Sequence, residues 1–293
     1  MRRFPSFLII LFIILSACQP VNNSSREIFQ ISRLESIPEG KQKILPEDDP
    51  TPPILHSDEW ETLVPLECPV TTAGLEDSPF ITPDGKILFF FFTPSADIPA
   101  QEQVNDGVTG IYWTHKVNDE WQEPERVWLT KPGKISLDGC PFYSGNTLWF
   151  CSIREGNFKD IDFWKADWDG RQWTNFSNAG KKLNKEIQVG ELHLTSNGRT
   201  IYFHQMGLNG QSGLDIWSTS LVNGEWEDPI FIEILNTAEN DSHLGLSPDD
   251  KELWFTRTYL GTPAVYRSKL IGGIWQPSDL VVSQFAGEPS VDS

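Results

Sequence analysis

The sequence predicts an all-β protein, a β-propeller built from four-stranded antiparallel blades. Three observations support this fold class. Tryptophans recur at intervals of 52, 53 and 49 residues, at Trp121, Trp173, Trp226 and Trp275. Three short segments rich in aromatic and β-branched residues, which are typical of strands, precede each of them, and clusters of Pro, Asp, Asn and Gly separate the segments. A fixed period of roughly 40 to 50 residues with four strands per unit is typical of blades that bury their faces only by stacking around an axis.

The most regular repeat spans residues 241–277, and three looser copies precede it. In each copy a strand leads into a turn, a hairpin supplies the second and third strands, and a short turn leads into a fourth strand marked by the tryptophan. The three earlier copies lie at residues 78–124, 138–173 and 191–229.

The motif SPDDKELWFT at residues 247–256, with PDGKILFF and SNGRTIYF as variants, resembles the WD-like repeat of TolB-type propellers. The resemblance covers residues 58–293 and implies one propeller domain over that range. It selects no function, because such repeats occur in periplasmic scaffolds, peptidase propeller domains and sugar-active proteins alike.

The two ends of the repeat region predict how the ring closes. Residues 58–65 match a fourth strand with no complete blade before it, and residues 287–291 match a first strand with no blade after it. We therefore predict five blades, the last completed by both termini, which removes exposed strand edges. One or two strands of that blade are missing from the pattern. Residues 53–56 are a candidate for one of them, and a truncated chain is the alternative.

The first residues predict an export signal. Two arginines precede an apolar core at residues 7–15, too short to span a bilayer, and Leu-Ser-Ala-Cys ends at Cys18. This segment resembles a bacterial lipobox, which implies that residues 1–17 are a lipoprotein signal peptide and that Cys18 is lipidated and anchored in the bilayer. Gln19 after the cysteine favours the outer membrane. An ordinary secretory signal is the alternative, and both place the protein outside the cytoplasm, in the cell envelope.

Residues 18–57 are predicted to be a flexible tether, because this proline-rich and acidic stretch has no strand alternation and few apolar residues to offset the entropy of ordering. The formal net charge of the chain is −18. An acidic surface repels phosphate backbones, which excludes nucleic acid as a partner. We expect an envelope protein or a saccharide ligand instead.

Cys140 and Cys151 are predicted to form a disulfide. With Gly145 and Asn146 as a two-residue turn, counting outward places the two cysteines opposite each other, with Cα atoms about 5.5 Å apart in a hydrogen-bonded pair. Cys68 is left over by this count. Free thiols are the alternative.

Acidic residues cluster where the first strands start, near one mouth of the central channel. Alignment of these strands places Glu76, Asp138 and Asp241 in one register, and Glu191 and Glu288 two residues later. Such a ragged ring could bind a cation such as Ca²⁺, or a cationic or sugar ligand, and the alternative is that the acids satisfy backbone donors. The candidate residues of the mouth are Glu76, Asp77, Asp138, Glu191, Asp241 and Glu288.

Two functions remain open from the sequence. We expect a noncatalytic binding or scaffold propeller. The alternative is a carbohydrate-active enzyme, because Asp77, Asp138 and Glu191 are similar in outline to the base, the pKa-tuning acid and the general acid of five-bladed glycosidases of the arabinanase type. Two carboxylates about 5 to 10 Å apart across an open pocket would indicate the enzyme, and capped or dispersed acids the scaffold.

No metal site is predicted from the histidines. The spacing of His193, His204 and His243 resembles no zinc motif, so we expect each to be an ordinary packed side chain and assign no metal ligand.

Overall fold

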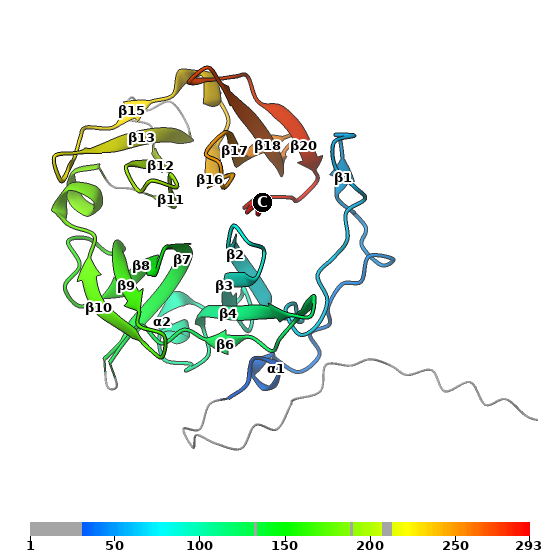
Figure 1. The fold of residues 1–293 in the computed structure, drawn as a ribbon. Coiled ribbons are helices and arrows are strands. Elements are labelled where there is room, and N and C mark those ends of the chain that lie inside the picture. The colour runs from blue at the N-terminus through cyan, green and yellow to red at the C-terminus, as the bar shows by residue number, and fades with distance from the viewer. Residues whose placement is uncertain (1–30, 132–133, 188–189, 207–212) are drawn as a thin grey trace, which may run out of the picture.

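Four antiparallel sheets surround a common axis in the computed structural model, which describes residues 31–131, 134–187, 190–206 and 213–293 (Figure 1). Each sheet is one blade with its first strand innermost, which confirms the all-β propeller prediction. Within these ranges, no helix has both the length and the apolar character needed to cross a membrane. The predicted signal peptide, residues 1–17, and Cys18 lie outside the described residues.

The first two blades carry the strands of the first two repeats. Blade I consists of β2 (Leu75–Ile81), β3 (Ile87–Thr93), β4 (Gly110–Val117), β5 (Glu120–Trp121) and β6 (Glu125–Arg126). Blade II consists of β7 (Ser136–Ser144), β8 (Thr147–Arg154), β9 (Asp162–Trp168) and β10 (Trp173–Asn178).

The other two blades add short outer strands in the same order. Blade III consists of β11 (Leu192–Leu194), β12 (Thr200–Met206), β13 (Leu214–Val222), β14 (Glu225–Trp226) and β15 (Ile230–Phe231). Blade IV consists of β16 (Asp241–Leu246), β17 (Glu252–Tyr259), β18 (Thr262–Ile271), β19 (Ile274–Trp275), β20 (Asp279–Ser283) and, at its edge, β1 (Ile54–Leu55). The helical segments are α1 (Arg33–Ser36), α2 (Ala100–Gln103), a π-helix at Lys182–Ile187 and a 3₁₀ turn at Glu233–Leu235.

The four periodic tryptophans lie on outer strands, and two of them, Trp173 and Trp275, pack against the blade before their own. Trp173 of blade II packs against Phe89 and Trp113 of blade I, with ring centroids 6.3 and 5.6 Å apart. Trp275 of blade IV packs edge-on against Tyr202 of blade III at 5.7 Å. The period in the sequence is therefore the period of contacts between blades.

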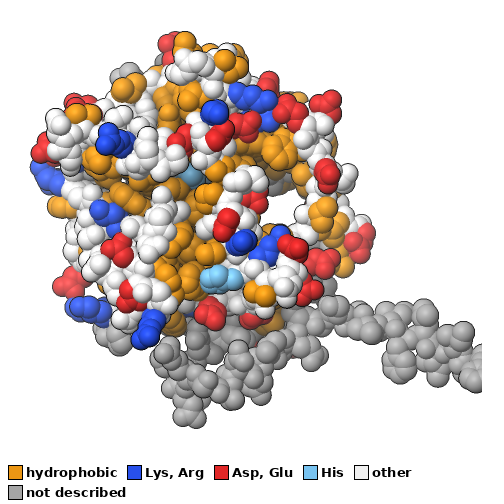
Figure 2. All heavy atoms as spheres, viewed as in Figure 1, with side chains coloured by type: hydrophobic (Ala, Val, Ile, Leu, Met, Phe, Trp, Pro, Cys, Tyr) orange, Lys and Arg blue, Asp and Glu red, His pale blue; other side chains and the backbone are white. Residues whose placement is uncertain are grey.

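The core lies on the second strands, whose phenylalanines, apart from the partly buried Phe91, are almost completely buried. Burying one such ring stabilises the fold by roughly 1.5 to 3 kcal/mol, so these strands fix the position of the inner strands beside them. Figure 2 shows apolar side chains gathered along the centre of one face, with charged side chains toward the rim. The phenylalanines less than 2% exposed are Phe89, Phe90, Phe92, Phe150, Phe203 and Phe255.

The described residues form four blades, and the predicted fifth blade is absent from them. Residues 58–65 contain no strand, contrary to the prediction. The candidate stretch just before them does pair, as β1 with β20 on the edge of blade IV. Side chains hold the next residues on that blade: Glu59 receives two hydrogen bonds from Arg267 at 2.9 and 3.0 Å, and Trp60 packs on Trp254 at 5.2 Å.

The C-terminal residues 287–291 occupy the place of a fifth inner strand without joining a sheet. They lie near the axis between β16 and β2 (Figure 1). The Ile81 N–H donates to Ser290 Oγ at 2.9 Å, and the carbonyl of Pro289 lies 2.5 Å from where a Cβ on Gly245 would be. This segment thus closes the ring at its centre. Its close approach to β16 requires glycine at residue 245.

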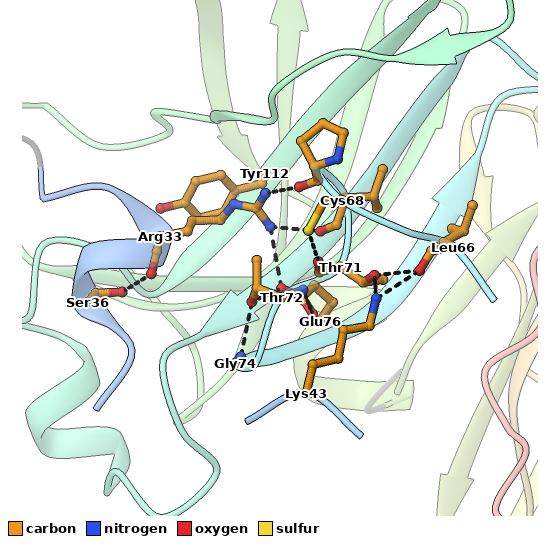
Figure 3. A network of polar contacts seen from close by, with 12 residues as sticks. Arg33, Ser36, Lys43, Leu66, Cys68, Thr71, Thr72, Gly74, Glu76 and Tyr112 are labelled. Carbon is orange, nitrogen blue, oxygen red and sulfur yellow. Dashed lines mark hydrogen bonds and ion pairs between the residues drawn. The ribbon is translucent and has the colours of Figure 1, made fainter. Parts of the chain in front are cut away.

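The described part of the predicted tether, residues 31–57, contacts the propeller at both of its ends: the stretch around Arg33 docks on blade I (Figure 3), and β1 pairs with blade IV. Arg33 is only 4% exposed and donates hydrogen bonds to the carbonyl of Val70 at 2.9 Å and to Glu76 at 3.4 Å. The amino-acid composition of the segment gave no sign that this guanidinium group is buried. It also lies over three aromatic rings at 5.3 to 5.5 Å, those of Phe90, Phe92 and Tyr112.

The predicted disulfide between Cys140 and Cys151 is present, with Cα atoms 5.4 Å apart. The pairing of the two strands follows the predicted register next to the turn and then shifts, so that Cys151 lies opposite Gly139. No cysteine in the described ranges is a free thiol. The count from the sequence left Cys68 over, and in the structure Cys68 is not free either.

Candidate functional site

One backbone irregularity recurs in the inner strands of blades I, II and IV. Strand pairing shifts register between Asp77 and Phe80, and at the corresponding places of β7 and β16. At each shift a residue other than glycine takes a positive φ, a conformation that costs about 1 kcal/mol and persists only where the surroundings hold it. The C-terminal segment repeats the conformation, and the four residues are Ser78, Cys140, His243 and Glu288, with φ of 46° to 54°.

Five chain segments line a small hollow at these positions, one from each inner strand and one from the C-terminal segment. The hollow has a volume of about 40 Å³. This is room for roughly three waters or one metal ion, and far less than the roughly 300 Å³ at which sites for small organic ligands begin. A sugar ring does not fit. The segments are residues 78–80, 140–142, 191–193, 243–244 and 288–290.

Three side chains that can bind a metal converge in the hollow. One ligand atom from each of Glu191, His243 and Glu288 lies within 4.8 Å of the other two, and all three residues are partly buried. His243 Nε2 and Glu288 Oε1 are 3.7 Å apart. Ser78 links the two acids: its N–H donates to Glu288 Oε2 at 2.7 Å and its hydroxyl donates to Glu191 Oε1 at 3.4 Å.

Two neighbours fix the orientation of His243. Its Nδ1 shares a hydrogen bond of 2.8 Å with the hydroxyl of Ser242, and its backbone N–H donates to His204 Nδ1 at 3.2 Å. The other ring nitrogen, Nε2, is left facing the carboxyl groups. Gly190 is required here, because a Cβ at this residue would lie 2.4 Å from the carbonyl of His204.

The electrostatics of the hollow disfavour bare negative charge. Burial, with Asp77 as a second cause, raises the pKa of Glu191 to about 7. Burial and a hydrogen bond with Asp77 raise the pKa of Glu288 to about 9. Burial lowers the pKa of His243, and that of His204 falls to about 3 for the same reason. The crowded carboxyl groups therefore favour either bound protons or a bound cation.

The structure separates the six predicted mouth acids into two sets. Asp77, Glu191 and Glu288 interact at the hollow, since Asp77 contributes to the raised pKa values of both Glu191 and Glu288. The others share a register, as the sequence alignment placed them, and each meets an arginine away from the hollow. The pairs are Glu76 with Arg33 at 3.4 Å, Asp138 with Arg154 at 2.6 Å and Asp241 with Arg257 at 2.5 Å.

These three acids are structural. Asp138 also accepts hydrogen bonds from two serine hydroxyls, and Asp241 from Thr237. In blades II and IV the arginine follows the acid by 16 residues. The same position in blade I is Phe92, and the guanidinium comes from the N-terminal segment instead. This spacing of acid and arginine was the signal in the sequence that would have identified the set.

A second hollow, of about 280 Å³, lies on blade II beside β11. The ring of Trp149 contributes to it, with Lys165 Nζ 5.1 Å from the ring centroid. Asp167 accepts hydrogen bonds from the hydroxyl of Thr147 at 2.7 Å and from the side chain of Asn175 at 3.1 Å. Its lining is therefore largely polar over an aromatic base.

Comparison with known proteins gives distant structural likenesses only. No family model matches the chain, and no curated protein matches its sequence. TolB from Acinetobacter baumannii is similar in structure at 15% identity and a TM-score of 0.42, over 75% of this chain and 47% of that one. A prolyl endopeptidase matches at 12% identity and 0.42, over 72% and 28%, and the Trypanosoma rangeli sialidase at 12% and 0.36, over 69% and 37%.

The chain therefore spans less than half the length of each of these three proteins. It has a β-propeller fold with distant structural similarity to TolB and to the propellers of prolyl peptidases. Likenesses this distant concern the fold alone, because the same architecture serves binding proteins and enzymes.

Proposed function

We propose that the chain is a noncatalytic binding propeller of the bacterial envelope, a TolB-type lipoprotein anchored in the outer membrane through Cys18. The observation that carries the noncatalytic part is the size of the central hollow, about 40 Å³, because glycoside hydrolysis needs an open pocket with a sugar between two carboxyl groups. Asp138, one of the three acids of the enzymatic alternative, is paired with Arg154 instead. The lipobox resemblance and the disulfide both support an extracytoplasmic location.

Labelling with radioactive palmitate in a bacterium with two membranes tests the anchor. We expect the wild type to be labelled and to sediment with the outer membrane, and a Cys18→Ser variant to lose the label. A Gln19→Asp variant is the matched control, because it keeps the cysteine and should move the labelled protein to the inner membrane. An unlabelled wild type in the soluble periplasm would refute the anchor.

One observation favours the enzymatic alternative enough to require its own test. The pKa of Glu191 is raised to about 7 by burial and by the neighbouring Asp77, as in a general acid beside a carboxylate. We expect no release of reducing sugar from a panel of polysaccharides by the wild type. Hydrolysis that disappears in Glu191→Gln and persists in the exposed control Glu225→Gln would establish the enzyme.

The second hollow is the proposed site for the saccharide or envelope-protein group, since the channel mouth is too small for a sugar. It offers the aromatic base of Trp149 and the polar groups of Lys165, Asp167 and Asn175. Asn175 has a φ of +53°, so Asn175→Gly keeps the backbone conformation while removing the amide. On a glycan array, we expect binding by the wild type to weaken in this variant. Equal binding by the wild type and the variant would show that the ligand binds at another place.

A further inference from the structure

We propose that Glu191, His243 and Glu288 bind one Zn²⁺ ion on the propeller axis. No metal was predicted from the histidine spacing, because the three ligands come from β16, from the residue before β11 and from the C-terminal segment. This inference goes beyond the proposed function and does not depend on where the protein resides or on what the second hollow binds.

The geometry suits a small tetrahedral ion. Zinc bonds of about 2.0 to 2.2 Å place two ligand atoms about 3.4 Å apart. His243 Nε2 and Glu288 Oε1 are 3.7 Å apart, so a shift of a few tenths of an ångström brings them to that distance. The third ligand, from Glu191, lies within 4.8 Å of both. The remaining volume has room for a water as the fourth ligand.

Each ligand is held by a neighbour in the way that metal ligands are. The Ser242 hydroxyl engages His243 Nδ1 at 2.8 Å, which directs the other nitrogen to the site. Ser78 holds one carboxylate oxygen of Glu288 at 2.7 Å and one of Glu191 at 3.4 Å. Such partners fix the tautomer and the orientation of ligands, and their loss typically lowers metal affinity 10-fold to 100-fold.

A second observation, independent of the three ligands, concerns a buried nitrogen atom of the same hollow. His193 lines it, and its Nδ1 is a buried nitrogen without a hydrogen-bond partner in the described ranges. Buried polar atoms rarely lack a hydrogen-bond partner, and a bound ion or water is a common partner where no protein group supplies one. A water bound to the metal would supply that partner.

The mixed ligand set decides which ion is bound. Ca²⁺ and Mg²⁺ take six or more oxygen ligands, whereas an imidazole with carboxylates suits Zn²⁺ and related transition metals. Three protein ligands including His243 therefore fit Zn²⁺ better than the Ca²⁺ suggested by the acidic ring. Bound zinc would join blades III and IV to the C-terminal segment, across the junction where the fifth blade is absent.

Isothermal titration with ZnCl₂, after removal of metals from the purified protein, tests the site. We expect one ion per chain and a loss of affinity of at least 10-fold in Glu288→Gln and in His243→Asn. Asparagine is chosen because it tolerates the φ of +46° at residue 243. The controls are Glu225→Gln and His115→Asn, which change the same residue types on exposed parts of blades III and I.

A milder variant covers the case in which a ligand variant does not fold. Ser242→Ala leaves all three ligands and is expected to lower zinc affinity 10-fold to 100-fold without changing the circular dichroism of the metal-free protein. The proposal is overturned if the wild type binds no zinc, if the ligand variants bind like the controls, or if Ca²⁺ binds more tightly than Zn²⁺.

Discussion

Replacing Arg33 with methionine removes the one guanidinium that docks the N-terminal segment on blade I. Methionine keeps the apolar stem among the aromatic rings but leaves Glu76 without its positive partner. The side chains of the two residues are 2% and 13% exposed, so water restores little of the lost interaction. The loss of one partner of a buried pair typically costs 3 to 5 kcal/mol.

We expect the lower end of that range, about 3 kcal/mol, because Thr72 continues to hold Glu76. Its N–H and hydroxyl donate to the carboxylate at 3.1 and 2.6 Å. Adding Glu76→Gln to the methionine variant removes the uncompensated charge and should recover about 1 to 2 kcal/mol of the free energy of unfolding.

Urea unfolding followed by tryptophan fluorescence measures these differences. Lys41→Met is the matched control, because Lys41 lies in the same N-terminal segment and pairs with Asp97 at 3.0 Å while both side chains are largely exposed. An exposed pair of this kind contributes at most about 1 kcal/mol. If Arg33→Met is as stable as Lys41→Met, the stretch around Arg33 is loose, as the composition suggested, and its docking on blade I contributes no stability.

Two further outcomes follow from the centre of the ring. A methyl group on Gly245 would lie 2.5 Å from the Pro289 carbonyl, so Gly245→Ala should displace the C-terminal segment, cost about 1 to 3 kcal/mol of stability and weaken zinc binding; unchanged stability would contradict this packing. In the metal-free protein, the folded-state pKa values of Glu191 and Glu288 are raised to about 7 and about 9. The folded state therefore holds protons that the unfolded state releases near its ordinary pKa. Stability should fall as the pH rises from about 7.5, one unit above the ordinary pKa of histidine, to about 9, by about 1 to 3 kcal/mol. Thermal unfolding at a series of pH values measures this decrease in stability, and most of the decrease should be absent in the Glu288→Gln variant.

The repeat structure could be predicted from the sequence because local signals carry it. Trp173 and Trp275 each contact the blade before their own, so their place in the repeat reports contacts between blades. The same alignment placed Glu76, Asp138 and Asp241 in one register, which the structure reproduces. Periodic features of this kind can be recognised from the types of residues and their spacing along the sequence.

The remaining features depend on single contacts between distant parts of the chain. The docking of Arg33 rests on one buried group, and the composition of its segment does not reveal it. The convergence of Glu191, His243 and Glu288 depends on the ring geometry and on bulges that turn side chains toward the axis. Among the described residues a fifth blade is absent because residues 58–65 do not pair through their backbone, and Glu59 docks through its side chain on Arg267 instead.

Diffraction data from crystals grown with Zn²⁺ and collected at the zinc absorption edge would locate the ion itself. We expect one anomalous difference peak on the propeller axis, within bonding distance of Glu191, His243 and Glu288. A peak only elsewhere on the molecule, or no peak at a zinc concentration that saturates the protein in solution, would contradict the assignment of this hollow as a zinc site.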